Sequence, residues 1–356
     1  MSKYYTTQPH FEKMFETTFR THTFKAETVD EFTAWKQSLT KKLWELTGMN
    51  RMVKCDFQPQ MLEEVKCDGY IRRKMLINTE PDVIASFYLL IPDNLGLGER
   101  RTAVIASHGH SSNGKEAVAG VRSSQAMAKT IDHYNYNYGE VLAQKGYIVL
   151  CPDARGFGER RERYYQGDSP EQIMGSSCDY LNVMAMSFGQ TVTGMWTWDL
   201  MRLVDYVLTR DDVNGHVASV GLSGGGLQSL WLSALDERIE CSVVSGYFYG
   251  YLESLLIRFN CLCNYVPHLW STVDIGDIGA LIAPRPLLIE TGDQDDLNGQ
   301  SGLLNVTTQI KTVQRAMDLT GKPGNIYHDI FSGGHRWHGE YAYRWLLKHC
   351  PPAERE

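Results

Sequence analysis

The stretch Ala218–Gly226 constrains the fold of this chain more than any other feature of its sequence. It reads Ala-Ser-Val-Gly-Leu-Ser-Gly-Gly-Gly, so that Gly221 to Gly225 match the pattern G-x-S-x-G. In a nucleophile elbow this pattern forms a sharp strand-to-helix turn that lifts one serine hydroxyl above a sheet. The glycines remove Cβ atoms that would clash with the flanking strand and helix. A flexible turn could carry the same five letters, so the flanking residues have to decide.

The flanks of Ser223 have the order that an elbow requires. Residues 216–220 have a β-strand pattern, and residues 227–235 predict a helix with apolar residues at helical spacing, namely Leu227, Leu230, Trp231 and Ala234. This context predicts Ser223 as a nucleophile. It also places the backbone N–H of Gly224 at a helix N-terminus, where it can donate to a developing oxyanion.

Composition places the chain among globular proteins and excludes several classes of partner. The 356 residues are 43% hydrophobic and 22% charged, which is typical of a globular protein with a large core. A net charge of −7 without a basic run argues against nucleic acid as a partner. No apolar stretch approaches the roughly 20 residues that span a bilayer, so we expect no membrane partner. The first ten residues contain no apolar signal-peptide core, which favours a cytoplasmic location.

The eight cysteines are scattered, which fits a reducing compartment. Only Cys261 and Cys263 are close in sequence, and C-x-C without other clustered ligands is poor zinc spacing. Cys151 and Cys241 lie in apolar runs and are expected to be buried thiols. Dinucleotide-binding, P-loop and H-E-x-x-H patterns are absent, so the sequence predicts no cofactor and no metal.

Alternating strands and helices predict a mostly parallel sheet with helices on both faces. Residues 70–77 and 83–91 should form an early antiparallel pair, followed by strands at 102–107, 147–151, 241–245, 286–290 and 325–331. We expect helices at 138–145, 306–319 and 340–348, and a long one over 183–208 that glycines interrupt or precede. Residues 61–350 would form the catalytic domain, with a small cap or long loop at 247–280.

Residues 1–60 are predicted to be a helical extension. A helix over 29–46, with Thr28 or Asp30 as N-cap, carries an apolar face that packs on the main domain or on a second subunit. The chain could therefore form a homo-oligomer through this N-terminal helix.

A serine nucleophile needs a base and an orienting acid, which follow it in the order acid, then histidine. The acid candidates come after the strand that breaks at Gly292: Asp295 is our first choice, Asp293 the second and Asp296 the third. The base candidate is His335, because Gly333 and Gly334 permit a tight turn directly after the last strand.

The other histidines of this region are weaker candidates for the base. His338 could line a pocket, His328 alternates within a strand, and His349 closes the last helix. The backbone N–H of His110, in the loop after residues 102–107, is the second oxyanion donor by position, and the side chain of His108 would hold that loop.

The loop at residues 153–160, after the 147–151 strand, is rich in charge. Its Asp153 and Arg155 would organise loops by ion pairing. Arg160, Arg161 and Arg163 would be either a solvated basic surface or the lining of a pocket for an anionic substrate.

Together these residues resemble the α/β-hydrolase superfamily over about residues 60–350, in the branch of the acetyl xylan esterases, cephalosporin deacetylases and dienelactone hydrolases. The segments that carry the resemblance are 153–160, 194–199, 221–226, 234–239, 282–286 and 332–335. Serine at 223, where dienelactone hydrolases have cysteine, argues against that activity. The resemblance implies the α/β-hydrolase fold and hydrolysis of small carboxylic esters, often acetyl groups on sugars.

Two other functions compete with the esterase. One is a serine peptidase or acyl-peptide hydrolase, although the N-terminal extension is too short for the propeller or cap that such enzymes usually carry. The other is a non-catalytic hydrolase scaffold, which would have a broken triad.

Overall fold

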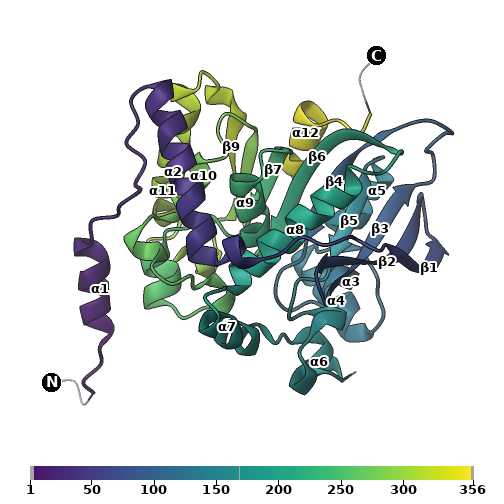
Figure 1. Cartoon of the computed structure of the whole chain (residues 1–356), viewed down its shortest axis with the longest axis horizontal. Coiled ribbons are helices and arrows are strands. Elements are labelled where there is room, and N and C mark those ends of the chain that lie inside the picture. The colour runs from purple at the N-terminus through teal and green to yellow at the C-terminus, as the bar shows by residue number, and fades with distance from the viewer. Residues whose placement is uncertain (1–3, 168, 354–356) are drawn as a thin grey trace.

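A single twisted sheet organises the molecule in the computed structural model, which describes residues 4–167 and 169–353. The described residues form nine strands in the order β1-β2-β3-β5-β4-β6-β7-β8-β9 (Figure 1). The first three strands and β5 pair in antiparallel fashion, whereas β5, β4, β6, β7, β8 and β9 run parallel. The strands are β1 Gln60–Lys66, β2 Tyr70–Glu80, β3 Val83–Pro92, β4 Arg101–Ser107, β5 Ile148–Pro152, β6 Val213–Leu222, β7 Ile239–Ser245, β8 Leu287–Gly292 and β9 Ile326–Phe331.

Helices cover both faces of this sheet and enclose two apolar cores. One core contains side chains of α2, α7, α8, α9, α10 and α11, and the other contains side chains of α4, α5 and α12. The helices are α1 Gln8–Thr17, α2 Val29–Thr47, α3 Lys115–Val118, α4 Gln125–Tyr134, α5 Tyr138–Gln144, α6 Pro170–Met174, α7 Cys178–Ser187, α8 Val192–Val207, α9 Gly224–Leu235, α10 Ile275–Ala280, α11 Leu303–Leu319 and α12 Glu340–His349. The α/β-hydrolase fold predicted from the sequence is confirmed.

The N-terminal helix α2 packs its apolar face against the rest of the chain. Its N-cap is Thr28, whose hydroxyl accepts from the N–H of Glu31 in a capping box. Phe32, Leu39 and Leu43 are buried. The sequence allowed this face to pack either on the main domain or on a second subunit, and in the structure it packs on the main domain of the same chain.

The helix expected over 183–208 is two helices. The chain breaks between α7 and α8, where Gly189 takes a left-handed φ of 69°. Gly194 lies in the first turn of α8, and a Cβ there would overlap the carbonyl oxygen of Thr47. Here the glycine permits close packing of α8 on α2 and does not break the helix.

Residues 247–280 combine short helical turns with one regular helix. A π-helical turn at Leu252–Ile257 is followed by short 3₁₀ turns and by α10, which begins at the capping box of Asp274. None of the described helices is both long enough and apolar enough to cross a membrane.

Candidate active site

Ser223 occupies the turn between β6 and α9 in a strained backbone conformation. Its φ of 61° and ψ of −120° lie where side chains other than glycine are rarely found. The N–H of Ser223 donates to the carbonyl of Ser245 at 2.9 Å, which ties the turn to the end of β7. The residue is half-buried, so a ligand can reach its hydroxyl.

The glycines around Ser223 are required by close backbone contacts. A Cβ on Gly221 would overlap the backbone of Gly225, and a Cβ on Gly225 would overlap the carbonyl oxygen of Ser107 in β4. The elbow is therefore packed so tightly that its geometry is set by the backbone alone.

His335 and Asp295 form a short ion-pair hydrogen bond, with 2.6 Å between Nδ1 of the ring and Oδ2 of the carboxylate. The other oxygen of Asp295 accepts from the N–H of Leu297 at 2.9 Å, so the buried carboxylate is held on both sides. Asp293 instead accepts from the N–H of Gly333, and Asp296 is exposed. Of the three acids that the sequence offered, the structure brings Asp295 to the histidine.

The ring of His335 lies at the carboxyl ends of the central strands. Its Cε1 would be 2.9 Å from a Cβ on Gly246, the residue that follows β7. Ser223 is bonded to the last residue of the same strand, so its side chain and the imidazole lie at the same end of the sheet. Because Nδ1 faces Asp295, Nε2 is the nitrogen that remains for a proton from the serine.

The loop after β4 passes directly over Ser223. A Cβ on Gly109 would be 2.9 Å from the Cβ of Ser223, so only glycine fits there. The carbonyl of His110 accepts from the Tyr136 hydroxyl at 2.7 Å, which fixes the loop. Within residues 4–167 and 169–353, the N–H groups of His110 and Gly224 donate to no protein acceptor. These are the two donors that the sequence predicted for an oxyanion.

A family model described as "Abhydrolase family" matches residues 2–332, a range that includes Ser223 and Asp295 and ends just before His335. The chain belongs to the Abhydrolase family. Over 221 residues it is 27% identical to the "Putative hydrolase YtaP" of Bacillus subtilis (strain 168). The matched region is 59% of this chain and 66% of that relative, so the chain spans just under two thirds of the relative's length.

Solved structures of esterases share the fold of this Abhydrolase member. A Bacteroides fragilis NCTC 9343 protein described as a "putative acetyl xylan esterase" superposes with a TM-score of 0.79 at 18% identity, over 98% of this chain and 95% of that one. The glucuronoyl esterase from Solibacter usitatus superposes with a TM-score of 0.60 at 16% identity, over 88% of this chain and 92% of that one. For the acetyl xylan esterase from Paenibacillus sp. R4 the TM-score is 0.56 at 17% identity, over 92% of this chain and 97% of that one.

His108 holds the loop that carries His110. Its Nε2 accepts from the N–H of Ala154 at 3.0 Å, so Nδ1 carries the proton and faces the carbonyl of Gly109 at 2.8 Å. Burial lowers the pKa of His108 to about 4, which keeps the ring neutral at physiological pH. This is the loop-holding role expected from the sequence.

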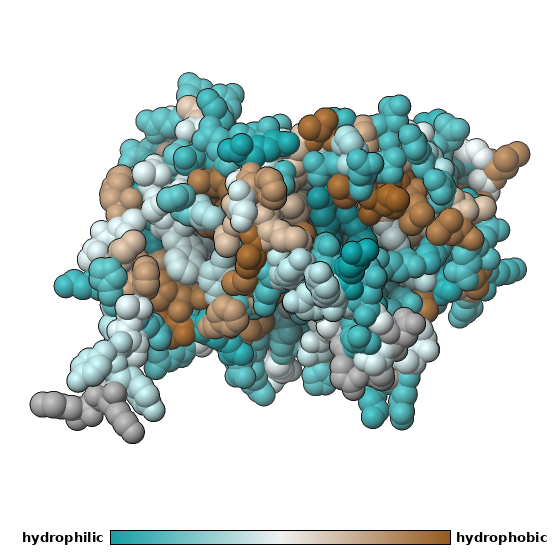
Figure 2. Space-filling view, turned by 60° about the horizontal axis from the view of Figure 1, so that its bottom comes forward, coloured by the Kyte–Doolittle hydropathy of each residue, from teal (hydrophilic) through white to brown (hydrophobic). Residues whose placement is uncertain are grey.

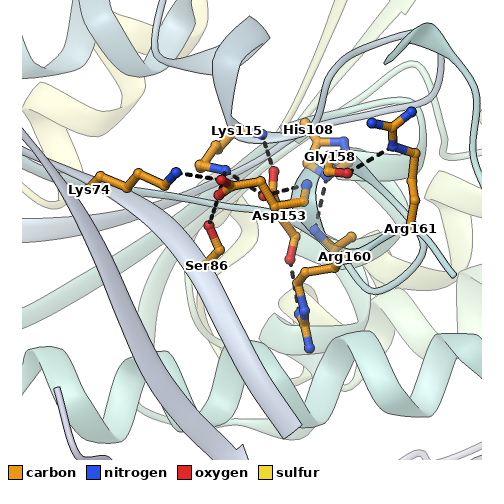
Figure 3. A network of polar contacts seen from close by, with 10 residues as sticks. Lys74, Ser86, His108, Lys115, Asp153, Gly158, Arg160 and Arg161 are labelled. Atoms are coloured by element: carbon orange, nitrogen blue, oxygen red, sulfur yellow. Dashed lines mark hydrogen bonds and ion pairs between the residues drawn. The ribbon is translucent and has the colours of Figure 1, made fainter. Parts of the chain in front are cut away.

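The loop after β5 in this Abhydrolase chain is held by ion pairs around the buried Lys115 and Asp153. Lys115 lies 2.6 Å from Asp153 and 2.7 Å from Glu159, and Lys74 and Ser86 converge on the same group (Figure 3). Although burial favours the neutral acid, Lys115 lowers the pKa of Glu159 to about 2.

The arginines of this loop are engaged with the protein itself. Arg155 and Arg160 both pair with buried Asp199 of α8, and Arg160 also donates to the carbonyl of Asp153. Arg161 donates to the carbonyl of Gly158 (Figure 3). The expected ion pairing of Asp153 and Arg155 is confirmed. Arg160 is held by its ion pair and Arg161 by hydrogen bonds to backbone carbonyls, while Arg163 is exposed.

A second polar cluster, in the loop that carries His335, was not predicted from the sequence. His338 binds Asp329 of β9 at 2.7 Å, and Glu290 of β8 accepts from the N–H groups of His338 and Gly339. His328 instead lies 3.0 Å from the hydroxyl of Thr291, within the sheet. The cluster ties the loop that carries His335 to two strands, and no sequence motif marks it.

Proposed function

We propose that this protein is a serine carboxylic-ester hydrolase for acetyl and other short-acyl esters, with small acetylated sugars as one substrate class. The observation that carries the proposal is the 2.6 Å pair of His335 and Asp295 at the sheet end where Ser223 occupies a strained elbow. The proteins with similar structures include acetyl xylan and glucuronoyl esterases, which supports ester chemistry.

In the proposed reaction, the Oγ of Ser223 attacks the ester carbonyl while Nε2 of His335 takes its proton. Asp295 orients the ring and stabilises the imidazolium. The N–H groups of His110 and Gly224 hold the tetrahedral oxyanion, and each such donor contributes about 3 kcal/mol in comparable sites. His335 then protonates the leaving alkoxide, and water releases the acid from the acyl-enzyme.

The decisive test compares wild type with Ser223→Ala. We expect wild type to hydrolyse p-nitrophenyl acetate and to be labelled by a fluorophosphonate probe, and the variant to lose labelling and on the order of 10⁴-fold or more in kcat/KM. A panel of esters with increasing acyl length then reports the acyl preference directly.

Two outcomes would overturn the proposal. Turnover of aminoacyl naphthylamides above that of esters would indicate a peptidase. Wild type that neither hydrolyses esters nor reacts with the probe would indicate a scaffold without catalysis.

A further inference from the structure

Three cysteines and a histidine from distant parts of the chain meet beside the oxyanion loop. They are His110 after β4, Cys178 at the start of α7, and Cys261 and Cys263 in the segment before α10. Their ligand atoms, the imidazole nitrogen and three Sγ atoms, all lie within 4.8 Å of one another. The C-x-C pair that has poor zinc spacing in sequence therefore gains two further ligands from the fold.

The spacing of these atoms fits a tetrahedral metal ion. Zinc bonds of about 2.3 Å to sulfur and about 2.0 Å to nitrogen give tetrahedral edges of about 3.8 Å between sulfurs and about 3.5 Å between sulfur and nitrogen. The distance between Sγ of Cys263 and Nε2 of His110 is 3.6 Å. Four protein ligands leave no open position, which is the arrangement of structural zinc sites.

The backbone on which each ligand stands is anchored independently of the cluster. The carbonyl of Cys263 accepts from the hydroxyl of Thr193 at 2.5 Å, and that of Cys261 accepts from the Asn264 amide at 2.9 Å. The start of α7 is bonded to the loop after β5 through Ser177 and Gly156. The four side chains are thus brought together by the surrounding fold.

We propose that His110, Cys178, Cys261 and Cys263 bind one zinc ion. Binding displaces the three thiol protons, so the ion is held by three thiolates and the neutral imidazole. A Cβ on Gly224 would lie 2.8 Å from Nδ1 of His110, so the ring packs against the residue that follows Ser223. A bound metal would hold this ring, and with it the residue whose backbone N–H is a proposed oxyanion donor. The site is structural and adds no metal chemistry to ester hydrolysis.

The test measures the metal content of the full chain, purified without metal-affinity columns or chelators. We expect about one zinc per chain by elemental mass spectrometry and a first shell of three sulfurs and one nitrogen by X-ray absorption. The double variant Cys178→Ser/Cys263→Ser should contain at least about tenfold less zinc per chain than wild type. The matched control Cys55→Ser/Cys67→Ser removes two half-buried cysteines outside the cluster and should keep all of it.

Wild type alone can overturn the proposal, even if the double variant does not fold. Less than about one tenth of a zinc per chain after equilibration with equimolar zinc and dialysis contradicts it. A disulfide among the cluster cysteines in intact protein contradicts it as well, as does a double variant that folds and binds zinc as wild type does. None of these readouts depends on esterase activity, so the proposed reaction and the metal site stand or fall separately.

Discussion

The strained backbone of Ser223 is maintained by neighbours that have no side chains. Gly225 shows this most directly, because the space that its Cβ would take is filled by the carbonyl of Ser107, a backbone atom in the middle of a sheet. Such an atom cannot move aside as a flexible side chain can.

Gly225→Ala should therefore destabilise the protein by roughly 3 kcal/mol, at the upper end of overpacking substitutions. Urea unfolding measures this. The control is Gly324→Ala, because a Cβ at Gly324 meets nothing within 4 Å. Equal stability of the two variants would contradict the packing argument.

The carboxylate of Asp295 has an assigned partner in His335, whereas that of Asp296 is exposed. Asp295→Asn should lower kcat by about 10²- to 10⁴-fold with little change in KM, because the amide favours the wrong tautomer of the ring. Asp296→Asn is the matched control and should stay within about twofold of wild type in ester hydrolysis. A larger loss in the control than in Asp295→Asn would move the acid role to Asp296.

Residue types and order were enough to predict Ser223, Asp295 and His335 as candidates, because each follows a strand at a glycine-containing turn. They left three acids open at residues 293–296, since the choice depends on which carboxylate the turn directs at the ring. The meeting of His110 and Cys178 with Cys261 and Cys263 was beyond such reasoning, because tertiary structure alone brings these segments together.

At the scale of elements, the turn after β9 is positioned by a buried acid in β8. Burial raises the pKa of Glu290 from 4.5 to about 7, so the folded protein favours its neutral form. A raised pKa of this kind stabilises the fold at low pH, and the contribution is lost as pH rises from about 4.5 through 7.

Glu290→Gln should remove this dependence, because glutamine stays neutral. Relative to the variant, wild type should lose on the order of 3 kcal/mol of unfolding free energy between pH 4.5 and pH 8. This follows from the difference of about 2.5 between the pKa of Glu290 in the folded chain and its ordinary pKa of 4.5. Urea unfolding of both proteins across this range measures the difference. Parallel pH profiles would show that Glu290 titrates alike in the folded and unfolded chain.

Strands and long helices were predictable from apolar periodicity, as α2, α9 and the central strands show. The edge strand β1 was missed, because its residues, Gln-Met-Leu-Glu-Glu-Val-Lys, do not alternate between apolar and polar, and the strand is almost entirely exposed. The helices α3 and α6 were missed because four and five residues are too few for a periodic signal. The ten-residue helix α4 was missed as well, although it has an N-cap at Ser124 and buries Met127 and Ile131 on one face.

Over the whole molecule, α1 lies beside the main body at the N-terminal end (Figure 1). It leaves Phe11 and Met14 about half exposed, each at 51%. With residues 265–271 they border an apolar hollow of about 380 Å³. Figure 2 shows apolar surface, in brown, at several places on one face of the molecule. An apolar patch of this kind is typical of an interaction surface.

The helix over residues 29–46, which the sequence offered as a contact between copies, buries its apolar face against its own chain. We therefore propose that the exposed apolar side chains of α1 join two copies instead. Light scattering after size exclusion should give a dimer for wild type and a monomer for Phe11→Asp/Met14→Asp. Lys13→Asp, on the same helix, serves as a charge control and should remain dimeric. A monomeric wild type at micromolar concentration would exclude this role for α1.

The order of the strands also determines when a newly made chain can become active. His335 follows β9, which is the last strand to be synthesised and pairs within the described sheet only with β8. With His335 as the proposed base, a nascent chain contains Ser223 long before it contains that base, and hydrolysis has to wait until the edge of the sheet is complete. In the finished protein, transient detachment of this one strand would silence the enzyme while the central core stays folded.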